Sequence, residues 1–178
     1  QRLSQKLVGS IVIEIDSSSD EKKIRQAAMN LLARREHSLH ELKDKLCQKF
    51  DNFDSVKIVA ERLRSENLQS DSRYVENFVR TRIARGQGLM KIEAELFNKG
   101  IEEGLLKKIC LDMKIDWNGL ARRVASRKVI NRKPSNQIER SKVIRFLQSR
   151  GFTLELPLSA IRCHIGEWSC RLLPRGSS

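Results

Sequence analysis

The chain has 178 residues, enough for one or two compact domains, and 39% of them are hydrophobic against 32% that are charged. A formal net charge of +13 favours acidic or polyanionic partners. Only three prolines argue against a many-turned β architecture, and no apolar run approaches the ~18 residues of a membrane span.

Residues 1–19 are predicted to be a leader without helical periodicity. Ile11, Ile13 and Ile15 recur at every second position, so either a short strand or a disordered segment is expected there. The segment carries no signal sequence, and we therefore expect a cytoplasmic protein.

Two helices are predicted next, each after the spacing of a capping box, in which two helix donors are satisfied reciprocally. The first follows Ser18 and Glu21 and ends near Arg35, and the second follows Ser38 and Glu41. Their apolar stripes are Ile24, Ala27, Ala28, Leu31 and Leu32 in the first, and Leu39, Leu42, Leu46 and Phe50 in the second.

A third helix, capped by Asp54 or Ser55, completes a predicted three-helix repeat over residues 20–69. Its inward residues are Val56, Val59, Ala60 and Leu63. Isolated helices of this length are marginal in water, so the three must pack together.

The pattern recurs over residues 70–115. Asp71 is placed to cap a helix, Gly86 and Gly88 interrupt it, and Gly100 supplies a left-handed helix stop. The apolar stripes of the three helices are Tyr74, Val75, Phe78, Val79 and Ile83; then Leu89, Ile92 and Leu96; then Ile101, Leu105, Ile109 and Met113.

Matching residues of these two segments lie 50 positions apart. Arg35, Leu42, Leu46 and Lys49 correspond to Arg85, Ile92, Leu96 and Lys99. Repetition with this period indicates units that stack on their neighbours.

A third copy is predicted over residues 116–152, although its third helix is not evident. One helix has the stripe Trp117, Leu120, Ala121, Val124, Ala125 and Val129, and another carries Ile138, Val143, Ile144, Phe146 and Leu147. The sequence therefore predicts an all-α protein of three tandem three-helix repeats that form an elongated, curved body.

Residues 153–178 are predicted to be a tail, either disordered or foreign to the fold. Pro157, Gly166 and Pro174 interrupt any long apolar stripe. The end, Leu173–Ser177, is typical of a protease-site linker, and we leave it out of the fold prediction.

Three segments in this order resemble the signature of the RecX family, over roughly residues 22–152. They are Ala28–Ser38 with Glu41, Leu42, Lys45 and Leu46; Arg85-Gly86 with Ile92, Glu95-Leu96 and Lys99-Gly100-Ile101; and Lys142 with Arg145-Phe146-Leu147 and Arg150-Gly151-Phe152. The chain departs from the family after Phe152, where family members usually continue as a helix.

The resemblance implies a cytoplasmic helical regulator that binds RecA nucleoprotein filaments. Such proteins inhibit the ATPase, strand-exchange and coprotease activities of RecA and favour filament disassembly. They have no catalytic centre, so we expect no cofactor and no metal, a monomer away from membranes, and contact with DNA at least within the filament.

Basic residues supply the candidate contact surface. Residues 116–152 hold ten Lys or Arg against two acids, a net charge of +8. The candidates for binding RecA or DNA are Arg34, Arg35, Arg80, Arg82, Arg85, Arg122, Arg123, Arg127, Lys128, Arg132 and Lys133. The alternative interpretation is ordinary solvated charge placed favourably near helix C-termini.

No set of residues predicts catalysis. Ser38 fits an N-cap and His37 a turn residue better than a nucleophile and its base. His37 with His40, and Cys163-His164 with Cys170, lack further ligands at metal-binding spacing. Gly86-Gln87-Gly88 lacks the rest of a dinucleotide fingerprint.

The cysteines are predicted to be reduced thiols. None of the four forms a CxxC pair, and Cys47 and Cys110 fall among apolar residues of helical patterns. A stand-alone basic helical DNA-binding protein remains the alternative to a RecA regulator, and an enzyme comes third.

Overall fold

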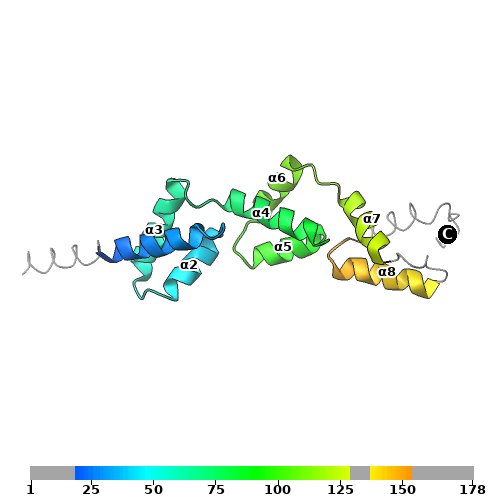
Figure 1. Cartoon of the computed structure of the whole chain (residues 1–178), viewed down its shortest axis with the longest axis horizontal. Coiled ribbons are helices and arrows are strands. Elements are labelled where there is room, and N and C mark those ends of the chain that lie inside the picture. Colours follow the sequence, from blue (N-terminus) through cyan, green and yellow to red (C-terminus); the bar gives the residue numbers. More distant parts are fainter. Residues whose placement is uncertain (1–18, 129–136, 154–178) are drawn as a thin grey trace, which may run out of the picture. The chain divides into compact units, whose positions relative to one another are not determined.

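The computed structural model describes residues 19–128 and 137–153, and every regular element in these ranges is a helix (Figure 1). The elements are a helix over residues 19–32, then α2 (Leu39–Cys47), α3 (Phe53–Ser65), α4 (Asp71–Ala84), α5 (Leu89–Phe97), α6 (Glu103–Asp112), α7 (Trp117–Lys128) and α8 (Gln137–Ser149). The predicted all-α class is confirmed, whereas the elongated, curved body stays a prediction.

Several predictions concern residues outside these ranges. They are the leader with its strand, the Ser18 cap, the contact residues Arg132 and Lys133, and the tail with Cys163, His164 and Cys170. The prediction about a third helix in the last repeat also concerns residues outside these ranges, because the described residues end one position after Phe152.

The described residues form two compact units. One takes residues 19–78 and 96–109, and the other takes residues 79–95, 110–128 and 137–153. Helices α4, α5 and α6 contribute residues to both units.

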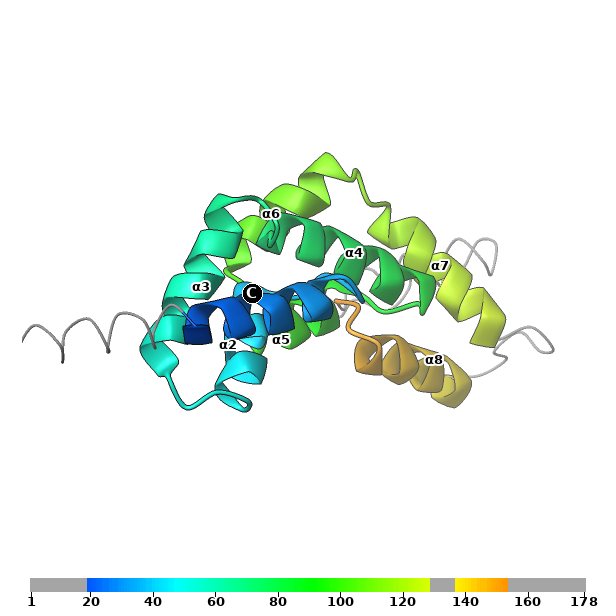
Figure 2. The same ribbon diagram turned by 60° about the vertical axis from the view of Figure 1, so that its left-hand side comes forward.

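The core of the first repeat follows the predicted stripes. Helix α2 lies beside α3 in both views of the chain (Figures 1 and 2). The buried cluster consists of Ile24, Ala28, Leu42, Leu46, Val56, Val59 and Leu63. Each helix buries one face against the others, which supplies the stability that the isolated helices lack.

The predicted cap of α3 was wrong. Asn52, rather than Asp54 or Ser55, is the N-cap, and its side chain accepts a hydrogen bond from the backbone N–H of Ser55 at 3.1 Å. Asp54 lies in the first turn instead, where its negative charge faces the positive end of the helix dipole.

The predicted capping role of Asp71 was also wrong. It is the first residue of α4, and Ser70 Oγ accepts the hydrogen bond expected of an N-cap, from Arg73 N at 3.4 Å. Asp71 Oδ1 accepts instead from the backbone N–H of Leu39 at 2.9 Å. The carboxylate thus satisfies a donor at the start of α2, which has no partner within its own helix.

Helices α7 and α8 lie side by side (Figure 2). Residues of both helices contribute to a second buried cluster. It consists of Leu120, Ala121, Val124, Ala125, Val143, Leu147 and Phe152, with Ile83, Trp117 and Phe146 packed against it. Ile138, predicted on the apolar face of α8, is 65% exposed among the described residues and does not belong to this cluster.

Successive repeats are joined where one helix begins and another ends. Ser38, at the start of α2, donates through Oγ to the Lys99 carbonyl just after α5, at 2.8 Å. Fifty residues later, Gly88 and Met90 donate their backbone N–H groups to the carbonyls of Arg150 and Gly151, at 2.7 and 3.1 Å.

The donor is a side-chain hydroxyl in the first junction and a pair of backbone N–H groups in the second. The donors lie at a helix N-terminus and the acceptors just after a C-terminus, so opposite ends of two helix dipoles also face each other. The 50-residue repeat of the sequence therefore places the two junctions at matching positions of successive repeats.

Candidate functional site

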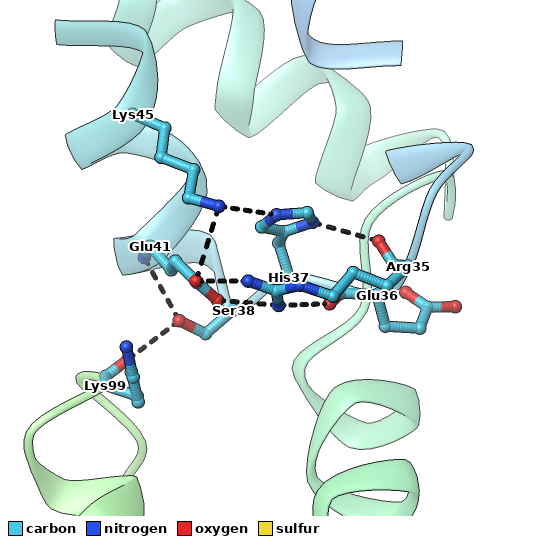
Figure 3. Close-up of polar contacts among 7 residues, drawn as sticks. All are labelled: Arg35, Glu36, His37, Ser38, Glu41, Lys45 and Lys99. Carbon is cyan, nitrogen blue, oxygen red and sulfur yellow. Dashed lines mark hydrogen bonds and ion pairs between the residues drawn. The ribbon is translucent and has the colours of Figure 1, made fainter. Parts of the chain in front are cut away.

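The predicted contact residue Arg35 is held in the turn before α2 (Figure 3). Its guanidinium donates to both carboxylate oxygens of Glu41, at 2.6 and 3.1 Å, and to the Glu36 carbonyl at 3.0 Å. The hydrogen bond from Arg35 holds the pKa of Glu41 down at about 2. This arginine therefore fixes the turn to α2, whether or not it also meets a partner, while Arg34 beside it is exposed.

His37 is buried in the same cluster, with 2% of its surface exposed. Its Nδ1 lies 2.9 Å from the Arg35 carbonyl and its Nε2 lies 3.2 Å from Lys45 Nζ. Because a carbonyl only accepts, Nδ1 carries the proton and Nε2 accepts from the lysine. Burial, reinforced by the charges of Arg35 and Lys45, lowers the pKa of His37 and keeps the ring neutral.

Ser38 is the N-cap of α2, as predicted. Its Oγ accepts from the backbone N–H of Glu41 at 3.1 Å and donates to the Lys99 carbonyl (Figure 3). The hydroxyl proton is therefore directed to that carbonyl, and the two ring nitrogens of His37 face other groups. This geometry is that of a structural link between repeats rather than of a nucleophile and its base.

Three of the predicted contact residues lie around one groove in the second unit. Arg80 comes from the last turns of α4, and Arg123 and Arg127 come from one face of α7. The other residues that line this groove are Ile83, Ala84, Gly86, Met113, Leu120 and Val124. The groove encloses about 460 Å³, and we refer to it as the arginine groove.

Other predicted contact residues take part in packing within the same unit. Arg82 pairs with Glu95 at 2.7 Å. Lys128 Nζ lies 5.1 Å from the ring centre of Phe146, and the guanidinium of Arg150 lies 5.2 Å from it, within the range of cation–π contacts. These charges stabilise α4, α7 and α8 in addition to any role in binding.

Arg85 and Arg122 lie outside the arginine groove. Arg85 is exposed in the turn after α4, and its carbonyl accepts from the Arg150 guanidinium at 3.0 Å. Arg122 is half-buried on α7 and does not line the groove beside its neighbour Arg123. The structure thus brings together three of the nine described candidates.

The sequence did not indicate the apolar floor of the arginine groove or the buried position of His37. Met113 was assigned to a helical stripe, but it follows the end of α6 and lines the groove. The 50-residue offset between Ser38 and Gly88 marks the two junctions in the sequence, but it does not show that His37, beside Ser38, is buried.

The remaining chemical features of the described residues are few. No group of three or more His, Cys, Asp or Glu side chains comes together there as a metal site. No helix of the described part is long and apolar enough to cross a membrane. Cys47 and Cys110 are free and half-buried, and burial raises the pKa of the Cys110 thiol, which makes it a weaker nucleophile at neutral pH.

Comparison with known proteins identifies the three repeats. Residues 25–53, 70–108 and 119–156 match the first, second and third three-helix domains of RecX. The fold is also similar to the crystal structure of RecX from Lactobacillus salivarius, with a TM-score of 0.72 at 24% identity, covering 81% of this chain and 96% of that one. The predicted arrangement of three three-helix repeats is thereby confirmed.

Two relatives show the same relationship at the level of sequence. "Regulatory protein RecX" of Halorhodospira halophila is 39% identical over 132 residues, which cover 74% of this chain and 82% of the relative. "Regulatory protein RecX" of Pseudomonas fluorescens is 38% identical over 133 residues, covering 75% of this chain and 86% of the relative. With all three domains matched in order, this chain belongs to the RecX family.

Proposed function

We propose that this chain is a regulatory protein that binds RecA nucleoprotein filaments and inhibits the ATPase, strand-exchange and coprotease activities of RecA. Membership of the RecX family carries the proposal, since relatives that are 39 and 38% identical over most of their length are named regulatory proteins. The regulator acts in the cytoplasm by binding, without chemistry of its own.

A binding protein regulates a filament through differential affinity. If it binds one state of the filament more tightly than the other, it shifts the population toward that state by the difference in binding free energy. A basic chain is suited to this task, because a filament that carries DNA offers phosphates and acidic side chains together. The net charge of +13 and the arginine groove support the proposal.

The proposal is tested by measuring ATP hydrolysis by RecA on single-stranded DNA while this chain is added at substoichiometric amounts. We expect the rate to fall well below that of RecA alone, since a regulator bound to a filament acts on many subunits. A rate that is unchanged at every ratio removes the proposed function. A basic protein of similar size and charge serves as the control for non-specific competition for DNA.

A stand-alone DNA-binding protein is the second candidate, and the exposed Arg85, Arg123 and Arg127 favour it. Binding to duplex DNA without RecA, with a steep salt dependence and a preference for sequence, is the result that this candidate predicts. Salt-dependent binding to DNA without a sequence preference is compatible with both functions, so the assay of ATP hydrolysis by RecA decides between them.

A further inference from the structure

The arginine groove combines two kinds of surface. Arg80, Arg123 and Arg127 supply positive charge, whereas the six other described residues that line the groove, from Ile83 to Val124 along the chain, are apolar or glycine. A site for a simple phosphate needs no such apolar floor. The combination indicates a ligand that carries negative charges and an apolar group together.

The groove is held in shape by a close approach at Gly86. This residue has φ +71°, and a Cβ placed on it would lie 2.8 Å from Cγ2 of Val124 on α7. The turn after α4 therefore packs directly on α7, and its glycine is required both by the backbone conformation and by the lack of space. The turn after α4 and helix α7 are therefore fixed relative to each other before a ligand binds, which lowers the entropic cost of binding.

None of the described residues that line the groove is acidic, so these residues supply no counter-charge to the arginines. Glu95 pairs with Arg82, and neither residue is among those that line the groove. Two lining arginines, Arg123 and Arg127, are exposed, so their guanidinium groups are available to a ligand from solution.

We propose that the arginine groove binds an acidic peptide segment of a partner protein, in which an apolar side chain is flanked by carboxylates. The carboxylates pair with the arginines, whose planar guanidinium groups suit bidentate hydrogen bonds. The apolar side chain covers Ile83, Ala84 and Met113, which are half-buried or exposed on the floor. The inference deepens the proposed function, because the assumption that the partner is a protein comes from that function.

The lining favours a peptide over a nucleic acid. Single-stranded DNA binds through a basic track together with aromatic side chains on which its bases stack. No aromatic residue is among the described residues that line the arginine groove, and the floor that they form consists of aliphatic side chains and Met113. An aliphatic floor contributes to the binding of a leucine-like side chain and contributes little to the stacking of a base.

The test uses fluorescence anisotropy with the full chain at one fixed ionic strength. The probe is a short fluorescein-labelled peptide of Glu, Asp and Leu. Its matched control has Ser in place of each Leu and therefore the same charge. A labelled oligothymidylate of similar length is the third probe. We expect the leucine peptide to bind about tenfold more tightly than its serine form, a ratio that corresponds to the burial of one or two aliphatic side chains.

Three variants separate charge from apolar contact. Replacing the two α7 arginines, R123E/R127E, is expected to weaken binding of both peptides by about tenfold or more. The matched control K57E/K108E reverses two exposed charges outside the groove and is expected to change affinity by less than about threefold. Met113→Ser is expected to weaken the binding of the leucine peptide and to leave the binding of the serine peptide unchanged. Thermal melting checks that each variant is folded.

The outcomes are distinct. Equal affinity for the leucine and serine peptides, or equal effects of R123E/R127E and K57E/K108E, overturns the inference, as does the absence of peptide binding. A larger effect of R123E/R127E on the oligonucleotide than on the peptides also overturns it, because the groove is then a nucleic-acid site. Inhibition of RecA by the wild-type chain is measured separately, so the inference can fail while the proposed function stands.

Discussion

At the scale of single residues, the turn before α2 shows how a polar cluster can join two repeats. Ser38 caps its own helix and reaches the Lys99 carbonyl, and Arg35 with Lys45 surrounds Glu41. A capping box directs a glutamate at the position of Glu41 back to the N-cap backbone, but here Arg35 takes its carboxylate. The Ser38 cap and the Arg35–Glu41 ion pair are therefore independent interactions, and substitutions can test each of them separately.

Ser38→Ala removes the N-cap of α2 and leaves the Lys99 carbonyl without its donor. We expect the free energy of unfolding to fall by about 1–2 kcal/mol, the usual cost of losing a cap, with the lost hydrogen bond contributing at the upper end. Urea denaturation measures this change. Ser149→Ala is the control, because that hydroxyl donates only to the Phe146 carbonyl of its own helix and is exposed. Equal losses in the two variants contradict the assigned role of Ser38.

Glu41 makes stability depend on pH at the acid end. Its pKa of about 2 in the folded chain lies below the ordinary value of 4.5, so folding favours the ionised form. The contribution of Glu41 is therefore fully present above pH 4.5 and is lost as the pH falls toward 2. We expect Glu41→Gln to be less stable than the wild type at pH 6 and to approach it at pH 2.5.

The comparison is made by urea denaturation at both pH values. Arg35→Met should give the same convergence, because the hydrogen bond from Arg35 is the main cause of the shifted pKa. The double substitution should cost much less than the two single losses combined, as expected for residues that act as a pair. A constant difference between Glu41→Gln and the wild type across this range contradicts the assignment.

At the scale of helices, the contacts between repeats depend on glycine at defined positions. Gly151 has φ +88°, and a Cβ there would lie 2.5 Å from the backbone nitrogen of Lys91. Gly104 in α6 has no atom within 4 Å of the same position. The two residues therefore form a natural pair for testing the junction between α5 and α8.

Gly151→Ala is expected to lower the melting temperature, because the left-handed conformation alone costs about 1–2 kcal/mol for a residue with a Cβ and the clash with Lys91 adds to this. Gly104→Ala is expected to be neutral or to stabilise the helix by up to about 1 kcal/mol. Differential scanning calorimetry of the two variants measures the contrast. A Gly151→Ala variant as stable as Gly104→Ala contradicts the tight junction.

The helices themselves could be predicted from the sequence, because apolar residues recur at helical spacing and the pattern repeats after 50 positions. The N-caps of α3 and α4 could not be predicted as well as the helices. For α3, Asn52, Asp54 and Ser55 are all good capping residues, and only the folded turn determines which of them is the cap. Asp71 was taken as a cap because its tertiary partner, the backbone N–H of Leu39, lies 32 residues away along the chain.

The candidate site could be predicted only in part, for a similar reason. A basic sequence identifies the arginines but does not say which of them meet in space. Arg80 lies more than 40 positions before Arg123, and the turn at Gly86 brings the end of α4 against α7. Arg82 pairs with Glu95, and Lys128 contacts Phe146. Because both partners belong to other helices, the apolar pattern within one helix does not predict these contacts either.

At the scale of the whole molecule, each repeat depends on its neighbour for contacts that it cannot make alone. Ser38 meets Lys99 in the next repeat, and Gly88 meets Arg150 in the one after. Stability built from neighbouring contacts of this kind resembles that of other repeat proteins. The surface proposed to bind a partner, the arginine groove, includes the exposed Arg123 and Arg127.

Direct binding to filaments tests the central claim. Single-stranded DNA is immobilised on a biosensor, and RecA filaments are assembled on half of the surfaces with a slowly hydrolysed ATP analogue. At near-physiological salt, we expect this chain to bind the filament at least about tenfold more tightly than bare DNA, because the filament adds protein contacts to the phosphates. Equal binding to the filament and to bare DNA would contradict a regulator of RecA and would identify a DNA-binding protein instead.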